Sequence, residues 1–502
     1  MSAGATAASL LDAAPAAATA VRRPEGDLLY GELRELVGAA AQALAATGTG
    51  HGDRVLIRCG EDFGRLVAIL ASHSVGAVAA ALNPATTGAE LEFLASHSDP
   101  QALVADEHLA GLDLAPEVAI LINEAGVLRA RRDRDGASEP RAPQPGDAAS
   151  LLYTSGSSAR PRGALLSHAA HVAMGADLAV LLGVGRDDRF LALSPFFHVG
   201  GWSTAVMPAL AAGASLVLPG PFSAGRFWAD AERWRPSVWT TGLAFLEMVA
   251  ARGGAAPAHP PFRHVISNLR PDTWKLAREV LGLPIGTYYG LTENDGRGTF
   301  ALAVDDYEPG FVGRVYTERD GLRLTKDGTE VAPGEVGEIE FRGPSTMSEY
   351  FRDPEATAKT LSDGWVKTGD LGRLGEDGDL YFSGRLKNMI KRSGENVSAE
   401  EVELFLLAHP EVEDVAVTAV ADRVREEEIK AIVVRAAGSE ASAEALHAFC
   451  REGMASFKVP RYFQFVAELP HTISGKPDIA AVRRNFASPE GSWDSLTQEQ
   501  PS

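Results

Sequence analysis

Cysteine is nearly absent from this chain, which has two cysteines among 502 residues. Cys59 and Cys450 lie far apart, and neither belongs to a metal-ligand spacing. This scarcity argues against a disulfide scaffold or a structural zinc site and favours a reducing, cytoplasmic location. The alanine-rich start, residues 1–20, lacks a basic segment ahead of its apolar residues. We therefore do not expect a signal peptide there.

Basic residues are also in short supply, since 47 lysines and arginines face 67 acidic residues and leave a formal net charge of −20. Such an excess of acidic residues argues against a general nucleic-acid binder or an anionic-membrane binder. Segment 190–224 has no charged residue, but several prolines and glycines interrupt it. The sequence therefore predicts a buried strand–loop–helix core there and no integral membrane segment.

What the chain does have is a globular composition, 45% hydrophobic and 23% charged, and a length that predicts two or more domains. Strand-like and helix-like segments alternate over 28–84 and again over 190–289, which predicts βαβ units and parallel sheets. Glycine-flanked alternating runs at 335–341 and 379–382 predict hairpins. Beyond residue 384 the pattern becomes that of a compact α+β unit.

The predicted fold class is therefore α/β. We expect a large N-terminal domain over 1–383, with parallel-type sheets, flanking helices and a β-rich subdomain. A small α+β C-terminal domain of about 100 residues is expected over 388–487, which is a usual domain size. The polar tail, 488–502, is expected to be disordered.

Segment Tyr153–Gly163 reads Tyr-Thr-Ser-Gly-Ser-Ser-Ala-Arg-Pro-Arg-Gly and lies between two apolar runs. Its glycines let the backbone approach a ligand closely, and successive N–H groups can form an anion-binding nest. Its hydroxyls can donate to phosphate oxygens, and its arginines add charge-assisted hydrogen bonds. The spacing of a Walker A loop is absent. A phosphate-binding loop is the functional interpretation, and a Ser/Gly surface linker is the alternative.

Four further polar motifs follow, and each has a structural alternative as an exposed turn, a strand end or a solvated face. In the first motif, Tyr289 can stack on a purine, Thr292 can donate to a phosphate, and Glu293 can hold Mg²⁺ through a hard oxygen. In the last motif, the ammonium group of Lys476 can neutralise charge that develops between a carboxylate and a phosphate. The motifs are Tyr288-Tyr-Gly-Leu-Thr-Glu293, Gly364-Trp-Val-Lys-Thr-Gly-Asp370, Gly384-Arg-Leu-Lys-Asn-Met-Ile-Lys-Arg-Ser-Gly-Glu-Asn396 and Thr472-Ile-Ser-Gly-Lys476.

In this order and at comparable spacing, the loop and the four motifs resemble the adenylate-forming superfamily. This superfamily contains acyl-CoA synthetases, peptide-synthetase adenylation domains and luciferases. The loop departs from the family pattern at three places: Ser157 and Ser158 replace two threonines, Ala159 replaces a glycine, and Arg162 replaces a lysine. Because the hydroxyls and the positive charge are kept, a phosphate clamp is still expected.

The resemblance implies an ATP site with three catalytic residues. These are Thr154, Glu293 and Lys476, and Glu293 would also be the ligand of Mg²⁺. Lys476 would meet both the substrate carboxylate and the α-phosphate, and Asp370 would accept from the ribose hydroxyls. The residues implied to bind ATP or AMP are Thr154, Ser155, Gly156, Ser157, Ser158, Arg160, Arg162, Tyr289, Gly290, Thr292, Glu293, Asp370, Arg385 and Lys476.

The resemblance also implies a mobile C-terminal domain and an entrance for a thiol. Residues 384–387 would form the hinge, and Lys387 occupies the family's hinge position. Lys391, Ser393 and Gly394 would line the entrance through which coenzyme A reaches the adenylate.

The expected substrate pocket departs from the family pattern. Where many relatives have small residues beside the substrate, this chain has Asn268, Leu269 and Arg270. Arg270 can point to solvent or pair with an acidic residue. It can also hold a polar or dicarboxylic acid, or mark a repurposed enzyme whose nucleophile is a small anion. Arg297 would add a second cation, and His198 would lie near the substrate carboxylate.

An acid–thiol ligase of the AMP-forming acyl-CoA synthetase type is the implied activity. A small or aromatic carboxylic acid would react with ATP to give an acyl-adenylate and pyrophosphate, and coenzyme A would then accept the acyl group. Three alternatives stay open: loading of a separate carrier protein, nitrite-dependent diazotisation of an arylamine, and a non-catalytic nucleotide-binding homologue. The expected cofactors are ATP, Mg²⁺ and coenzyme A, and the expected partner is a small-molecule acid. The sequence contains no signal from which the oligomeric state can be predicted.

Overall fold

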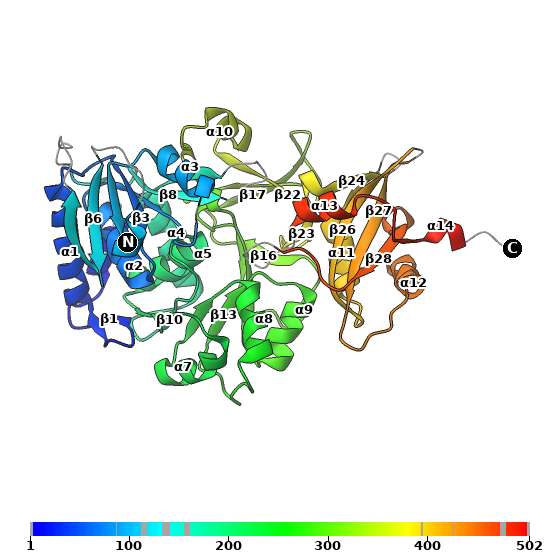
Figure 1. Ribbon diagram of the computed structural model, residues 1–502, viewed down its shortest axis with the longest axis horizontal. Coiled ribbons are helices and arrows are strands. Elements are labelled where there is room, and N and C mark those ends of the chain that lie inside the picture. Colours follow the sequence, from blue (N-terminus) through cyan, green and yellow to red (C-terminus); the bar gives the residue numbers. More distant parts are fainter. Residues whose placement is uncertain are drawn as a thin grey trace.

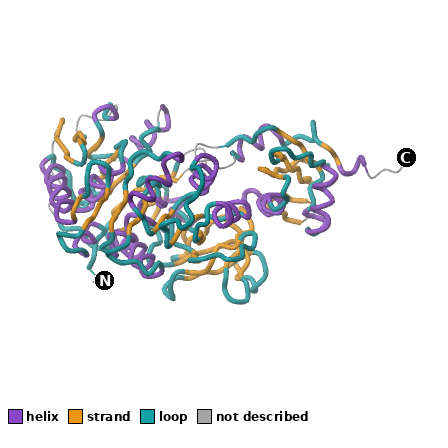
Figure 2. Tube along the Cα trace, turned by 90° about the horizontal axis from the view of Figure 1, so that it is seen from below, coloured by secondary structure: helices purple, strands orange, loops and turns teal. Residues whose placement is uncertain are grey.

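Three sheets organise the molecule, which is a computed structural model that describes residues 4–86, 88–111, 118–132, 141–154, 161–392, 395–423, 425–471 and 478–498. A 15-stranded sheet and an 8-stranded sheet form the larger body, and a 6-stranded sheet forms the smaller body near the C-terminus (Figures 1 and 2). The predicted α/β class, with a large N-terminal sheet domain and a smaller C-terminal domain, is confirmed.

The 8-stranded sheet carries the strands on either side of the predicted phosphate loop. Its strands, in spatial order, are β20 (Glu349–Tyr350), β9 (Arg162–Ser167), β8 (Ala148–Thr154), β4 (Val78–Ala81), β3 (Arg54–Arg58), β5 (Ala102–Ala105), β6 (Ala119–Glu124) and β7 (Val127–Arg132). The strands from β8 through β4, β3 and β5 to β6 pair in parallel, whereas β9 pairs antiparallel with β8 and β20 with β9. Strands β4 and β5 are buried along their whole length, as in a sheet covered on both faces.

The 15-stranded sheet is parallel at one end and antiparallel at the other. Its strands are β1 (Thr19–Arg22), β2 (Leu28–Leu29), β10 (Arg189–Leu191), β11 (Ser215–Val217), β12 (Val238–Thr240), β13 (His264–Ser267), β14 (Ile285–Tyr289), β15 (Thr299–Ala301), β16 (Phe311–Val315), β17 (Gly321–Lys326), β18 (Thr329–Glu330), β19 (Gly337–Arg342), β21 (Leu361–Ser362), β22 (Trp365–Leu374) and β23 (Leu380–Arg385). Strands β10 to β14 pair in parallel, and β14 to β16 and then β23 pair antiparallel. The antiparallel end is the predicted β-rich part.

Helices of several types cover these two sheets. They are η1 (Ala8–Ala13), α1 (Tyr30–Ala46), α2 (Asp62–Ser74), α3 (Gly88–Ser98), η2 (Glu107–Leu109), α4 (His168–Leu181), α5 (Val199–Gly201), the π-helix η3 (Trp202–Val206), α6 (Met207–Ala212), η4 (Ala224–Arg226), α7 (Phe227–Trp234), α8 (Leu243–Arg252), α9 (Pro271–Lys275), the π-helix η5 (Leu276–Val280), η6 (Thr292–Asn294) and α10 (Pro354–Thr360). None of the helices that the structure describes is long and apolar enough to cross a membrane.

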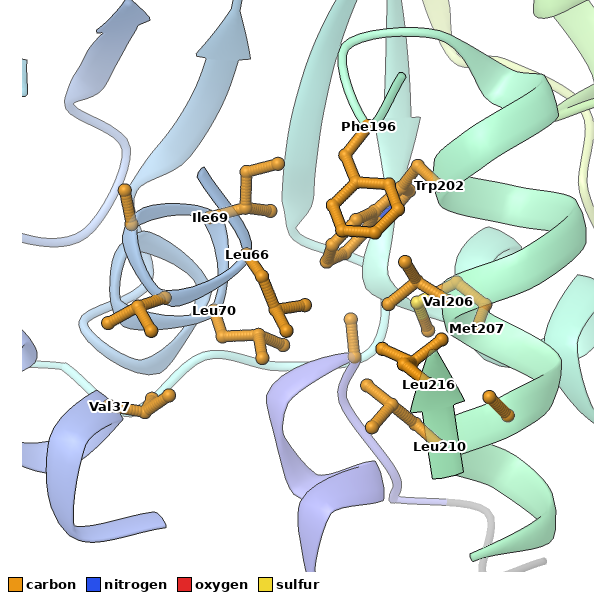
Figure 3. Packing of buried hydrophobic residues seen from close by; sticks show 14 of the residues in the cluster. Val37, Leu66, Ile69, Leu70, Phe196, Trp202, Val206, Met207, Leu210 and Leu216 are labelled. Atoms are coloured by element: carbon orange, nitrogen blue, oxygen red, sulfur yellow. The ribbon is translucent and has the colours of Figure 1, made fainter. Parts of the chain in front are cut away.

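The charge-free segment 190–224 lies in the core, as the sequence predicts. It forms β10, α5, η3, α6 and β11, and most of its side chains are buried. Figure 3 shows Leu66 and Leu70 of α2 facing Trp202 and Met207 across this core. Burial of such large side chains contributes about 1.5–3 kcal/mol each. The apolar character of the segment therefore reflects packing between the two sheets.

The smaller body is an α+β unit built on the 6-stranded sheet. Its elements are η7 (Leu386–Asn388), β24 (Met389–Arg392), β25 (Glu395–Ser398), α11 (Ala399–Leu407), β26 (Val412–Asp422), β27 (Glu426–Arg435), α12 (Ala443–Gly453), η8 (Ser456–Lys458), β28 (Tyr462–Val466), α13 (Ile479–Phe486), β29 (Trp493–Asp494) and α14 (Ser495–Gln498). Ser398 and Ser442 begin α11 and α12 by accepting a hydrogen bond from a backbone N–H of the first turn. Helix α11 packs against α9 and β23 of the larger body.

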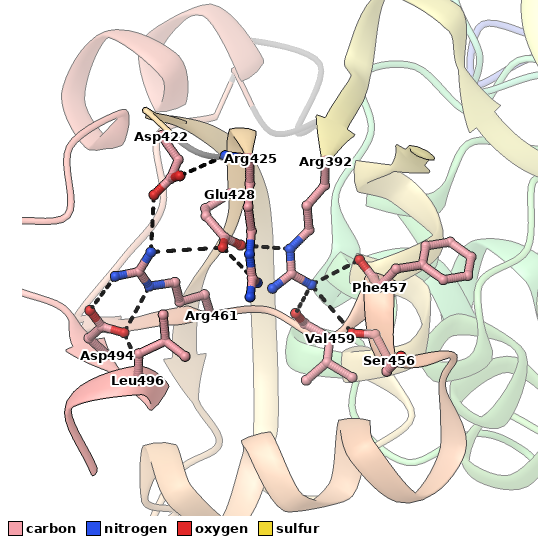
Figure 4. A network of polar contacts seen from close by, with 10 residues as sticks. All are labelled: Arg392, Asp422, Arg425, Glu428, Ser456, Phe457, Val459, Arg461, Asp494 and Leu496. Atoms are coloured by element: carbon pink, nitrogen blue, oxygen red, sulfur yellow. Dashed lines mark hydrogen bonds and ion pairs between the residues drawn. The ribbon is translucent and has the colours of Figure 1, made fainter. Parts of the chain in front are cut away.

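The prediction of a disordered tail is wrong for residues 488–498. Strand β29 pairs antiparallel with β28, and Asp494 accepts two hydrogen bonds from the Arg461 guanidinium, both at 2.9 Å (Figure 4). Composition alone does not reveal this order, because Arg461, the partner of Asp494, lies 33 residues earlier, just before β28. Residues 499–502 lie outside the described part of the chain.

Candidate active site

The predicted phosphate loop is carried by the hairpin of β8 and β9. Strand β8 ends at Thr154 and β9 begins at Arg162, and these two residues lie opposite each other in the antiparallel pair. The hydroxyl of Thr154 lies 3.5 Å from the carbonyl oxygen of Arg162. The predicted residues Ser155, Gly156, Ser157, Ser158 and Arg160 lie outside the described residues.

Glu293 and Arg162 meet around Tyr350. The hydroxyl of Tyr350 donates to Glu293 Oε1 at 2.5 Å, and the guanidinium of Arg162 lies 5.6 Å from the centre of the tyrosine ring. Burial and the Glu293 carboxylate raise the pKa of Tyr350, so its hydroxyl keeps the proton that it donates. Arg162 Nε also lies 3.6 Å from a carboxylate oxygen of Asp353. Sequence reasoning missed Tyr350, because it belongs to no motif and meets its partners only when β20 joins β9.

Tyr289, Asp370 and Arg385 form a second group. The hydroxyl of Tyr289 donates to Asp370 Oδ2 at 2.7 Å, and Arg385 Nε lies 3.0 Å from Asp370 Oδ1. Asp370 and Arg385 lie opposite each other in the β22–β23 pair. The ring of Tyr289 packs against Phe341 and Phe382 and is only 8% exposed. Burial and the Asp370 carboxylate raise the pKa of Tyr289.

A tight turn places Thr292 and Glu293 after Tyr289. The N–H of Leu291 donates to the side chain of Asn294 at 2.8 Å, and the N–H of Gly296 donates to the carbonyl of Leu291 at 2.7 Å. A Cβ at Gly290 would lie 2.1 Å from the carbonyl oxygen of Gly296, so only glycine fits at this point of the motif.

His198 and Asn268 both lie near Tyr288. The Nδ1 atom of His198 accepts from the N–H of Gly200 at 3.0 Å, which assigns the proton of the neutral ring to Nε2. A Cβ at Gly200 would lie 3.3 Å from that Nδ1 and 3.9 Å from the Tyr288 hydroxyl, so the two rings share one region. Asn268 is exposed and donates to the carbonyl of Tyr288 at 3.3 Å.

Leu269 and Arg270 both have partners within the protein. Leu269 is buried in the apolar cluster beneath α8, and its carbonyl accepts from the Tyr307 hydroxyl at 2.8 Å. Arg270 Nη2 lies 3.3 Å from Glu247 Oε1, which is the acidic pairing that the sequence left open.

Arg297 lies in a buried ion-pair network. Its guanidinium contacts both carboxylate oxygens of Asp320, at 2.6 and 2.7 Å, and a carboxylate oxygen of Asp177 at 2.7 Å. Burial acts to lower the pKa of Arg297, but the two aspartates raise it above its ordinary value. Since these carboxylates compensate its charge, Arg297 does not supply the second pocket cation that the sequence predicts. The sequence gives no signal for this pairing, because Asp177 and Asp320 belong to no motif.

The junction to the smaller body contains the predicted hinge, 384–387. Glu400 of α11 accepts from the N–H of Arg385 at 3.3 Å and also from the side chain of Asn388. The structure describes only the backbone at Lys387, in η7, and at Lys391, in β24. Ser393, Gly394 and Lys476 lie outside the described residues. Within those residues, no group of three or more His, Cys, Asp or Glu could hold a metal ion.

Comparison with known protein families decides the family. A family model described as AMP-binding enzyme matches residues 11–351, and a second, AMP-binding enzyme C-terminal domain, matches residues 401–476. The chain belongs to the AMP-binding enzyme family. The first match covers the strands that carry Arg162, Tyr289 and Tyr350, and the second covers most of the smaller body.

Relatives cover nearly the whole length of this AMP-binding enzyme. Sulfoacetate–CoA ligase of Cupriavidus necator is 33% identical over 89% of this chain and 91% of its own. Indoleacetate–CoA ligase of Aromatoleum aromaticum is 33% identical over 93% of this chain and 95% of its own. The crystal structure of ATP-bound MatB from Rhodopseudomonas palustris has a TM-score of 0.83 at 26% identity and covers 97% of this chain and 99% of its own.

These findings confirm the predicted enzyme class, an AMP-forming ligase of the acid–CoA type. Membership of this class implies the use of ATP and coenzyme A and a small-molecule acid as the substrate. The relatives do not support a separate carrier protein as the partner.

Proposed function

We propose that this enzyme activates a small or aromatic carboxylic acid as an acyl-adenylate, with release of pyrophosphate, and then transfers the acyl group to coenzyme A. One observation carries the proposal: five of the predicted ATP-site residues lie in two groups on the 15-stranded and 8-stranded sheets. Tyr289, Asp370 and Arg385 form one group, and Glu293 and Arg162 form the other around Tyr350. The first fits the nucleoside of ATP and the second its phosphates.

In the nucleoside group, the Asp370 carboxylate accepts from the ribose hydroxyls. Its two oxygens are oriented by the Tyr289 hydroxyl and the Arg385 guanidinium, at 2.7 and 3.0 Å. A charged acceptor fixed in this way loses little further freedom when it binds a ligand, so the site is organised before ATP arrives.

In the phosphate group, the hairpin from Thr154 to Arg162 binds the β- and γ-phosphates. Arg162 brings positive charge, and Glu293 keeps one hard carboxylate oxygen oriented by Tyr350. This donor set fits Mg²⁺, which commonly takes one or two carboxylates together with substrate phosphates. When bound, Mg²⁺ would supply charge neutralisation at the phosphates.

The first reaction is attack of a carboxylate oxygen on the α-phosphorus of ATP. A C–O–P bond forms as the bond to pyrophosphate breaks. His198 can donate from Nε2 to the carboxylate, and Lys476 meets the carboxylate and the α-phosphate. Most of the acceleration comes from positioning and charge stabilisation.

In the second reaction, the thiol of coenzyme A attacks the acyl carbon, and AMP leaves. The C-terminal domain, 388–487, rotates about the hinge 384–387 between the two reactions, a domain-scale switch of a known kind. Lys387 lies at the hinge, and Lys391, Ser393 and Gly394 line the entrance for the thiol.

We expect a substrate with one carboxylate rather than a dicarboxylate. The Arg270 guanidinium is paired with Glu247, and Arg297 is paired with Asp177 and Asp320. The two arginines that the sequence offered for a second carboxylate thus already have protein carboxylates as partners. The relatives named above act on sulfoacetate and indoleacetate, which are acids of limited size.

A pyrophosphate-release screen tests this function directly. The panel contains monocarboxylic acids, dicarboxylates, and nitrite with an arylamine, each with ATP and Mg²⁺. We expect release with a small or aromatic monocarboxylate and consumption of free coenzyme A in the same mixture. Release with nitrite alone would favour diazotisation, release without use of coenzyme A would favour a carrier protein, and silence across the panel would favour a non-catalytic homologue.

Substitution of Lys476 separates the two reactions. We expect Lys476→Ala to abolish pyrophosphate release but to leave thiolysis of a supplied acyl-adenylate intact. Lys359→Ala is the matched control, because this exposed lysine pairs only with Glu355 on the surface of α10 among the contacts that the structure describes. Equal loss of both reactions in Lys476→Ala would contradict the proposed role.

A further inference from the structure

Five buried polar side chains lie in a row behind the candidate active site. They come from α2, β8, α4, η3 and the residue that ends η6, and each is at most 2% exposed. His73 Nε2 lies 3.3 Å from Ser150 Oγ, and Ser150 Oγ lies 2.9 Å from His171 Nε2. His171 Nδ1 lies 2.8 Å from Asp295 Oδ2, and the Ser203 hydroxyl donates to Asp295 Oδ1 at 2.5 Å. We call these five residues the Asp295 chain.

Donor and acceptor counting fixes the direction of every bond in the Asp295 chain. An ionised carboxylate only accepts, so His171 donates from Nδ1 to Asp295. The other nitrogen of a neutral His171 then accepts from the Ser150 hydroxyl, whose oxygen accepts from His73 Nε2. Burial holds the pKa of His73 well below its ordinary value, which keeps that ring neutral. With an ionised Asp295 and a neutral His171, each bond between the five side chains thus has one donor and one acceptor.

The Asp295 chain has the order of a hydrolytic Asp–His–Ser triad but cannot act as one. Ser150 is 2% exposed, and its hydroxyl is held between two imidazole rings. A nucleophile must come within hydrogen-bond reach of a substrate, and the burial of Ser150 prevents this. Any effect on the reaction must therefore pass through the backbone segments that the chain joins.

Those segments are the ones that carry the predicted active-site residues. Ser150 lies on β8, which ends at Thr154. Ser203 lies on the π-helix that follows His198 and α5. Asp295 ends η6 in a left-handed conformation, with φ 58°, and its N–H donates to the carbonyl of Thr292 at 3.0 Å. The phosphate hairpin, the Thr292–Glu293 turn and the His198 helix are thus tied to a single carboxylate.

We propose that Asp295 is a positioning residue that fixes Glu293 relative to the phosphate hairpin and His198. The proposal rests on the proposed function, because it assigns these three segments to one reaction. Attack on the α-phosphorus requires the reacting groups to be held within fractions of an ångström, and a misplacement of about 1 Å can cost about 100-fold in rate. The nucleoside group lies outside the Asp295 chain, so its contribution to ATP binding does not depend on Asp295.

The test compares Asp295→Asn with the wild type and with Asp188→Asn. Asparagine keeps the shape of Asp295 but replaces one acceptor oxygen with a donor. The amide can present its N–H₂ or its oxygen to His171; with the N–H₂ in that place, His171 adopts its other tautomer, which reverses its bond to Ser150. Asp188 is the matched control because it accepts from Ser237 at 2.7 Å and from Arg263 at 3.0 Å, at the opposite end of β10 from the site.

We expect kcat for pyrophosphate release by Asp295→Asn to fall about 10–100-fold, as for other residues that orient a catalytic group. The KM for ATP should change much less than kcat, because the nucleoside group stays intact. Asp188→Asn should lower the Tm without lowering kcat. In ¹⁵N NMR spectra, the His171 ring should carry its proton on Nδ1 in the wild type and on Nε2 in Asp295→Asn, with the signal assigned by its loss in His171→Gln.

The outcomes separate this inference from the proposed function. If the wild type binds no ATP, the proposed function fails and the role of Asp295 fails with it. If the wild type is active and Asp295→Asn has the same kcat, only the role of Asp295 is overturned. The role is also overturned if Asp188→Asn, at a similar loss of Tm, loses as much kcat as Asp295→Asn does. Should Asp295→Asn not fold, Ser203→Ala removes one of the two donors to Asp295. Ser203→Ala should lower kcat by less than Asp295→Asn does, again with a smaller change in the KM for ATP. An unchanged kcat would overturn the role.

Discussion

Each body of the molecule contains a buried polar network built around a carboxylate, and the two networks stabilise that carboxylate with different chemical groups. In the larger body, the Asp295 chain surrounds one carboxylate with uncharged hydroxyl and imidazole groups. In the smaller body, Glu428 is equally buried but lies among arginines: Arg392 at 2.7 Å, Arg425 at 3.0 Å and Arg461 at 3.8 Å (Figure 4). One network is a relay of hydrogen bonds, and the other is a cluster of charges.

The difference reflects what each network joins. Arg392 also donates to the carbonyls of Ser456, Phe457 and Val459, so the Glu428 network holds β24, β27 and η8 together. It thereby stabilises the fold of the smaller body. The Asp295 chain joins segments that the core already packs and adjusts how they lie relative to one another. We therefore expect substitutions in the Glu428 network to change stability and substitutions in the Asp295 chain to change the rate.

The largest effect on stability is expected for Glu428→Gln. Loss of the carboxylate leaves Arg392 and its neighbours without compensation, and breaking a buried pair in this way costs about 3–5 kcal/mol. Hydrogen–deuterium exchange should increase in peptides from β26, β27 and β28. Peptides from the 8-stranded sheet should exchange as in the wild type. Protection that is unchanged in β27 would contradict the stabilising role of this network.

Asp370→Asn should have the next largest effect, on ATP binding. A hydrogen bond to a charged group contributes about 1.5–3 kcal/mol, so the KM for ATP should rise about 10–100-fold. This is the reverse of Asp295→Asn, which should lower kcat far more than it changes the KM for ATP. Asp379→Asn is the control, because this buried aspartate of the same β-rich part pairs with Arg314 at 2.7 Å. An equal rise of KM in the control would refute the assignment of Asp370 to the nucleoside.

Glu403 makes the stability of the smaller body depend on pH, and the direction of this dependence follows from the pKa of Glu403. Burial, with Glu400 and Asp414 nearby, raises the pKa of Glu403 to about 8, although Arg270 and the N–H of Val417 act against this shift. The folded state therefore binds a proton that the unfolded chain has lost above its ordinary pKa of 4.5. The stabilisation is complete below that value and disappears as the pH rises through about 8.

The Tm of Glu403→Gln should accordingly vary less over this pH window than the Tm of the wild type. Glu413→Gln is the matched control, since Glu413 is exposed on the neighbouring strand β26. Parallel Tm curves for the wild type and Glu403→Gln would show that Glu403 is ionised in the folded state. In that case the smaller body would contain two buried ionised carboxylates, Glu403 and Glu428. The expected difference between a protonated Glu403 and an ion-paired Glu428 would then be lost.

The sequence predicts those features whose signal is local. The charge-free composition and the prolines of 190–224 indicate a core segment, and this segment is buried in the structure. The resemblance brings Tyr289, Asp370 and Arg385 together, and these three residues are indeed in contact. In each case a short stretch of sequence is enough to recognise the feature, without knowledge of which distant residues contact it.

The features that the sequence misses depend on partners far along the chain. Tyr350 gains its role only when β20 joins β9, and Asp295 only when α4 and η3 pack beside it. Arg297 looks like an available cation until Asp177 and Asp320 reach it. The sequence states the charge and type of each side chain. Which groups neutralise that charge or bind that side chain is decided only when the chain packs.

The smallest effect is expected for Arg352→Gln, close to Tyr350. Arg352 lies 2.6 Å from Asp99, but both side chains are about half exposed, at 52% and 48%. Solvent and salt screen such a pair, so its loss should change the free energy of unfolding by less than about 1 kcal/mol. Urea unfolding and kcat should both remain close to the wild type, because the buried hydrogen bond from Tyr350 to Glu293 holds β20 beside the site. A fall in kcat like that of Asp295→Asn would mean that surface charge, and not only the buried network, sets the position of Glu293.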